Sequence, residues 1–195
     1  MLVVICGAEL FTGNNLMTLG CINCRYKFND VLRNWVCVYI ANFIGSVLLA
    51  LVVSGSGLVA AGTPAGDLAI NIAKNKVAMS FGAAVLRGIL CNILVVLAVW
   101  MATGAKDIIG KIFACWFPIM LFVLSGYEHS VANMYFIPLG MFIGAPVTWG
   151  QVWLNNLIPV TIGNLIGGAV LVPLFYHVAY LKSAAPVASS KDAKA

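Results

Sequence analysis

The feature that constrains this chain most is a series of long apolar stretches that carry almost no charge. One of them runs from Ile89 to Met101 without an acidic or basic side chain. About 20 apolar residues cross the hydrocarbon core of a bilayer as a helix. Five stretches are long enough to do so: residues 1–20, 34–54, 77–102, 112–140 and 151–181. Because several exceed a single crossing, we expect some helices to be tilted or interrupted.

The composition excludes the soluble alternatives. Acidic and basic residues make up only 9% of the 195 residues, whereas soluble domains usually carry about 25%. So little charge argues against a cytosolic enzyme, a nucleic-acid-binding domain and a secreted disulfide scaffold. Strands of a membrane barrel would alternate apolar and polar residues, so the continuous apolar runs favour helices. The sequence therefore predicts an all-α, polytopic membrane protein without enzymatic activity or a nucleic-acid partner.

The basic residues predict the orientation in the membrane. Eight of them fall on one side of the predicted helices: Arg25, Lys27, Arg33, Lys106, Lys111, Lys182, Lys191 and Lys194. Only Lys74 and Lys76, in the predicted loop at 55–76, lie on the other side. Short basic loops face the cytoplasm. We therefore expect residues 1–182 to form a transmembrane domain with residue 1 outside, and residues 183–195 to form a cytoplasmic tail.

The chain contains an internal repeat. Gly7-Ala8-Glu9, Asn14 and Leu19-Gly20 match Gly126-Tyr127-Glu128, Asn133 and Leu139-Gly140, and Asn34, Asn42 and Gly45 match Asn156, Asn164 and Gly167. The charge rule makes the matching segments cross in opposite directions, as in the inverted repeats of transporters and channels. Such repeats need an odd number of helices per half, and the first half shows two. We therefore expect a sixth helix before Met1; the alternative is a genuine five-helix protein.

Four motifs closely resemble the formate/nitrite transporter family. They are Gly7–Thr12 (GAELFT), Arg87–Asn92 (RGILCN), Ser125–Met134 (SGYEHSVANM) and Asn156–Asn164 (NLIPVTIGN). The resemblance implies an aquaporin-like helical bundle with broken helices, assembled as a homopentamer in a bacterial or archaeal cell membrane. It implies one pore per protomer for small monovalent anions, with formate as the first expectation and nitrite or hydrosulfide as alternatives. A non-functional fragment and a membrane redox subunit are the competing hypotheses.

His129 is the residue on which the functional prediction depends. An ionisable residue deep in a transmembrane segment indicates function by default, and the small, polar stretch around His129 predicts a helix break. The resemblance makes His129 the central pore residue; from its position alone, a buried neutral histidine is an equal alternative. Desolvating a bare carboxylate is very costly. A proton from a histidine with a pKa of about 6.5 would convert the anion into a neutral acid, so we expect low external pH to favour import.

The resemblance also assigns roles to residues around His129. It implies polar pore residues at Thr12 and Asn92, hydrophobic gates at Leu10, Phe11, Val95 and Phe122, and a vestibule cation at Lys76. Apolar residues in membrane helices are mostly core or lipid-facing, and an interhelical hydrogen bond is the competing interpretation for Asn92.

The two intramembrane carboxylates occupy equivalent positions of the repeat. We expect Glu9 to pair with Asn42 and Glu128 with Asn164, each pair fixing a broken helix to its neighbour. A carboxylate would repel an anionic substrate, so a structural role is favoured. The six cysteines and two histidines form no pattern that indicates a metal or a cofactor.

Overall fold

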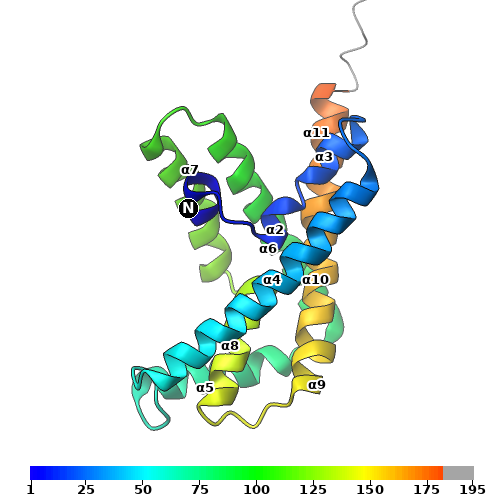
Figure 1. The fold of residues 1–195 in the computed structure, drawn as a ribbon. Helices are drawn as coiled ribbons and strands as arrows, with labels where there is room; N and C mark the ends of the chain where they lie inside the picture. Colours follow the sequence, from blue (N-terminus) through cyan, green and yellow to red (C-terminus); the bar gives the residue numbers. More distant parts are fainter. Residues whose placement is uncertain (182–195) are drawn as a thin grey trace, which may run out of the picture.

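The computed structural model describes residues 1–181, and every regular element in that range is a helix (Figure 1). The predicted cytoplasmic tail, residues 183–195, lies outside the described residues. The shorter elements are α1 (Leu2–Cys6), α2 (Phe11–Asn14), α3 (Met17–Ile22), α5 (Pro64–Val77), α7 (Ile108–Leu124) and α8 (Ser130–Phe142). The all-α, polytopic class predicted from the apolar runs is confirmed.

Three helices are long and apolar enough to cross a membrane. They are α4 (Phe28–Gly55), α6 (Phe81–Gly104) and a continuous helix over Trp149–Leu181. The last comprises α9 (Trp149–Gln151), η1 (Val152–Leu157), α10 (Ile158–Leu165), η2 (Ile166–Leu171), α11 (Val172–Tyr176) and η3 (His177–Leu181), in which the η segments are π-helical. In Figure 1, α4 runs diagonally across the front, and the helix containing α10 and α11 stands at the right.

The other two predicted crossings are interrupted, as expected for broken helices. The segment at 1–20 is divided among α1, α2 and α3, and the segment at 112–140 between α7 and α8. Each first half ends near a glycine in the left-handed region, Gly7 with φ 75° and Gly126 with φ 68°. Glycine takes this conformation without a Cβ penalty and ends helices for that reason. The repeat therefore places equivalent breaks in both halves.

The region at 55–76, predicted as a loop, contains the helix α5. Thr63 caps it by accepting a hydrogen bond from the Gly66 N–H at 3.1 Å, and Pro64 occupies its first position. Lys74 and Lys76 lie in its last turn, where cations are favourable. The hydropathy pattern missed α5 because polar residues interrupt its apolar ones. Ala73 and Val77 are buried in a core shared with α8, while Asp67, Asn71 and Lys74 are exposed.

Close backbone contact joins α6 to the long C-terminal helix. A Cβ at Gly163 would collide with the Val85 carbonyl, and one at Gly167 with the Ile89 carbonyl. Small residues let membrane helices approach in this way. The two halves of the repeat also meet directly, since the Tyr39 hydroxyl lies 2.9 Å from Thr161 Oγ1. These two residues are separated by the same offset as Asn42 and Asn164, so the contact joins equivalent positions.

Candidate functional site

His129 occupies the N-cap of α8, inside the second helix break. Its ring is 7% exposed. Nδ1 accepts a hydrogen bond from the Ala132 N–H at 3.0 Å, and Nε2 lies 2.7 Å from Thr12 Oγ1. Because Nδ1 is an acceptor, the ring proton belongs on Nε2, which donates to the Thr12 hydroxyl. The geometry thus defines a neutral imidazole that both caps one broken helix and contacts the other.

Apolar side chains form the surroundings of this imidazole. The Phe122 ring is stacked on it, with centroids 5.7 Å apart and planes inclined by 15°. Leu10, Val95 and Phe122 belong to one apolar cluster, so three of the four predicted gate residues lie together, and Phe122 joins the cluster to His129. Phe11 lies elsewhere: its ring is buried edge-on against Tyr39, with centroids 4.8 Å apart.

Two asparagines fill the hydrogen-bonding vacancies that the helix breaks create. Asn164 donates to the Glu128 carbonyl at 3.0 Å and accepts from the Ser130 N–H at 2.9 Å. In the first half, Asn42 donates to the Glu9 carbonyl at 3.1 Å and accepts from the Phe11 N–H at 3.0 Å. The predicted Glu–Asn pairs therefore meet through the backbone carbonyl of each glutamate and not through its carboxylate. An amide suits this role because it offers a donor and an acceptor at once.

The carboxylates themselves bind a second set of asparagines. In each half, one amide nitrogen donates both to the glutamate and to a further asparagine oxygen, giving the chains Glu9–Asn14–Asn34 and Glu128–Asn133–Asn156. All six residues were part of the repeat seen in the sequence, but the sequence did not show that they would bind one another. These chains tie each break to the following long helix.

Lys76 has a different environment from the open vestibule position expected for it. Its ammonium lies 2.9 Å from both carboxylate oxygens of Glu128, and the two side chains are 18% and 5% exposed. Within residues 1–181 this is the only ion pair. The pair neutralises the carboxylate beside His129, so the charge of Lys76 is not free to attract anions on its own.

Asn92 forms hydrogen bonds between helices. Its amide nitrogen donates to Asn15 Oδ1 and to the Asn164 carbonyl, both at 2.7 Å, and no hydrogen bond joins it to His129 or Thr12. The structure thus contains the interhelical hydrogen bond of the competing interpretation, and the pore role of Asn92 stays a prediction. Asn15 was not singled out from the sequence, although an amide in an apolar segment was a usable signal.

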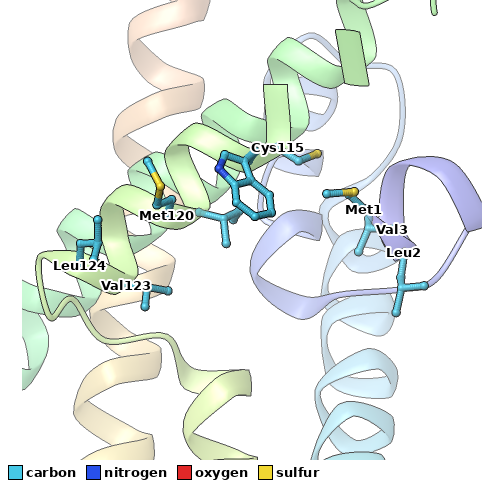
Figure 2. A pocket seen from close by; sticks show the side chains of 9 residues that line it. Met1, Leu2, Val3, Cys115, Met120, Val123 and Leu124 are labelled. Carbon is cyan, nitrogen blue, oxygen red and sulfur yellow. The ribbon is translucent and has the colours of Figure 1, made fainter. Parts of the chain in front are cut away.

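A separate apolar groove lies between α1 and α7 (Figure 2). It has a volume of about 590 Å³ and is lined by residues that include Met1, Val3, Cys115 and Leu124. None of its lining side chains is acidic or basic, and none belongs to the His129 site.

The fold and the site together define a class. Two broken helices meet at a buried imidazole within an inverted repeat of apolar helices, which is the architecture of a membrane channel or transporter. More specifically, the chain belongs to the formate/nitrite transporter family, whose model matches residues 1–178. The family predicted from the sequence motifs is thereby confirmed.

Individual relatives agree with this assignment. The chain is 44% identical to a probable formate transporter of Methanothermobacter thermautotrophicus, over 93% of this chain and 72% of that protein. It is 38% identical to the formate channel FocA of Escherichia coli (strain K12), over 93% of this chain and 70% of that one. A solved pentameric formate channel with formate bound superposes with a TM-score of 0.80 at 34% identity, covering 92% of this chain and 78% of that one.

Proposed function

We propose that this chain forms a homopentameric channel for small monovalent anions, with formate as the principal substrate. Residues 1–182 would form the channel domain in a bacterial or archaeal cell membrane, with the C-terminus in the cytoplasm. The names of the relatives support formate, and the pentameric relative supports the assembly. The positive-inside distribution of basic residues supports the orientation. Nitrite and hydrosulfide are alternative substrates, since both are small monovalent anions with neutral acid forms.

The His129–Thr12 contact is the observation that carries this proposal. It brings an imidazole N–H and a hydroxyl together where the two helix breaks meet. The Phe122 ring stacks on this imidazole and belongs to an apolar cluster with Leu10 and Val95. An anion that reaches this point would exchange water for the imidazole N–H and the threonine hydroxyl. The apolar walls then favour passage of a neutral molecule over an ion, because an unpaired ion in an apolar medium is strongly disfavoured.

A proton step follows from the hydrogen bonds of His129. In an imidazolium both nitrogens are donors, so protonation at Nδ1 breaks the bond from the Ala132 N–H. The charged ring would attract the anion and transfer the Nε2 proton to it, giving a neutral acid and a neutral imidazole. Movement of the remaining proton from Nδ1 to Nε2 restores the cap. Water on the more acidic side supplies each proton, so transport is linked to the pH difference.

The test is uptake of labelled formate into proteoliposomes at a series of external pH values. Wild-type uptake should rise as the external pH falls, by up to about tenfold per pH unit, because the charged fraction of a titrating group changes by that factor. His129→Phe should flatten this profile. His177→Phe is the matched control, because His177 lies in η3 outside the site.

An unchanged pH profile in His129→Phe contradicts the proton step. Absence of formate uptake by the wild-type protein contradicts the channel assignment itself. Parallel measurements with nitrite and hydrosulfide in the same vesicles identify the preferred anion.

A further inference from the structure

Departures from the internal repeat around the helix breaks single out four polar residues. At the supporting positions both halves carry the same residue type, as in Glu9 and Glu128, Asn14 and Asn133, or Asn42 and Asn164. At four positions between residues 9 and 15 a polar residue in one half matches an apolar residue in the other: His129 with Leu10, Ser130 with Phe11, Thr12 with Val131, and Asn15 with Met134. His129 and Thr12 form the central contact of the site, and the Ser130 N–H donates to Asn164 Oδ1. The role of Asn15 is the remaining question.

Asn15 is fully buried and uses both ends of its amide. Its nitrogen donates to the Phe11 carbonyl at 3.1 Å, and its oxygen accepts from Asn92 at 2.7 Å. Asn92 is also fully buried, and its amide nitrogen donates a second hydrogen bond to the Asn164 carbonyl at 2.7 Å. Asn15 thus links the first broken helix to α6 and, through α6, to α10.

The hydrogen bonds that run from Asn15 through Asn92 to Asn164 lead back to the Thr12–His129 contact. Asn164 Oδ1 accepts from the Ser130 N–H at 2.9 Å, and Ser130 follows His129 directly. At the other end, Phe11 directly precedes Thr12. Since Thr12 and His129 lie 2.7 Å apart, the hydrogen bonds and the two short backbone connections form a closed ring. This ring fixes the separation of the two helix breaks at the point where they meet.

We propose that Asn15 is a positioning residue that sets the Thr12–His129 contact and, through it, the pH response of transport; this inference rests on the proposed channel function. An apolar side chain at position 15 removes the side-chain donor to the Phe11 carbonyl and one of the two acceptors of the Asn92 amide nitrogen, and α2 is then free to move relative to α8. The fold itself does not require an amide here, because the repeat-equivalent position holds the fully buried Met134. The amide at position 15 therefore serves the contact and not the architecture.

A double-mutant cycle tests this inference by uptake of labelled formate into proteoliposomes. Asn15→Leu removes both hydrogen bonds with little change in volume, and Thr12→Val removes the hydroxyl at the contact. Each single change should flatten the pH profile of uptake. Independent effects of the two substitutions would multiply in the double variant. If both substitutions act through the Thr12–His129 contact, the uptake of the double variant should exceed that product by more than about twofold, as expected for coupled residues.

Thr161→Val is the matched control. The Thr161 hydroxyl lies 2.9 Å from the Tyr39 hydroxyl, so it joins α10 to α4 outside the ring. This variant should keep the wild-type pH profile and combine with Thr12→Val as an independent change. If Asn15→Leu does not assemble, Asn15→Ala is measured in the same cycle.

Independent effects of positions 15 and 12, or an unaltered pH profile in the Asn15 variant, overturn the inference while leaving the channel assignment intact. If the wild-type protein takes up no formate, the channel assignment fails instead.

Discussion

Asn42 and Asn164 occupy equivalent positions of the repeat, but replacing each of them with alanine should lower the free energy of unfolding by different amounts. Asn164→Ala removes three side-chain hydrogen bonds, to the Gly88 and Glu128 carbonyls and from the Ser130 N–H. Asn42→Ala removes two, to the Glu9 carbonyl and from the Phe11 N–H. Asn164 is fully buried, whereas Asn42 is partly exposed. The two substitutions are chemically identical, so any difference in their effects reports the environment alone.

The magnitude follows from the partners left behind. A buried polar group that loses its partner costs about 1–3 kcal/mol, whereas hydrogen bonds between membrane helices average about 0.6 kcal/mol. For the three bonds of Asn164 we expect a loss of about 3–5 kcal/mol in the free energy of unfolding. For the two partly exposed bonds of Asn42 we expect about 1–2 kcal/mol.

Unfolding in mixed detergent micelles with increasing sodium dodecyl sulfate measures both values. The five tryptophans provide a fluorescence signal, and circular dichroism reports the helix content. Equal losses, or a larger loss for Asn42→Ala, would refute the reasoning, because the environment of the second break would then not be what stabilises it.

Two further predictions use the same unfolding assay. Gly163→Ala should lower the free energy of unfolding by about 1–3 kcal/mol, because its Cβ would collide with the Val85 carbonyl. Gly45→Ala is the control and should change stability little, because its Cβ would meet nothing within 4 Å. A larger loss for Gly45→Ala than for Gly163→Ala would contradict the packing described. Lys76→Met should cost about 3–5 kcal/mol by leaving the Glu128 carboxylate unpaired, and adding Glu128→Gln should restore most of that loss. A Lys76→Met variant as stable as the wild type would show that the ion pair does not stabilise the fold.

The sequence predicted helices best where their residues are uniformly apolar. Hydropathy found the long helices and the family motifs found His129, since both signals are local. Hydropathy missed α5, because a short helix that mixes polar and apolar residues has the same mean hydropathy as a loop. The predicted pairing of Glu128 with Asn164 was right at the level of residues. The atoms differed because a glutamate offers two kinds of acceptor, and only the helix break leaves its backbone carbonyl without a partner.

The sequence by itself determined that the protein lies in a membrane, that its halves repeat with opposite orientation, and that its family is the formate/nitrite transporters. Each of these depends only on residue type and spacing along the chain. Apolar length decides which segments enter the lipid, and the placement of basic residues decides their orientation. Only the tertiary structure decided which polar groups meet. Thr12 and His129 are 117 positions apart, and Lys76 and Glu128 are 52 apart. Hydrogen bonds form over about 3 Å, so contacts between such distant residues exist only once the helices have packed.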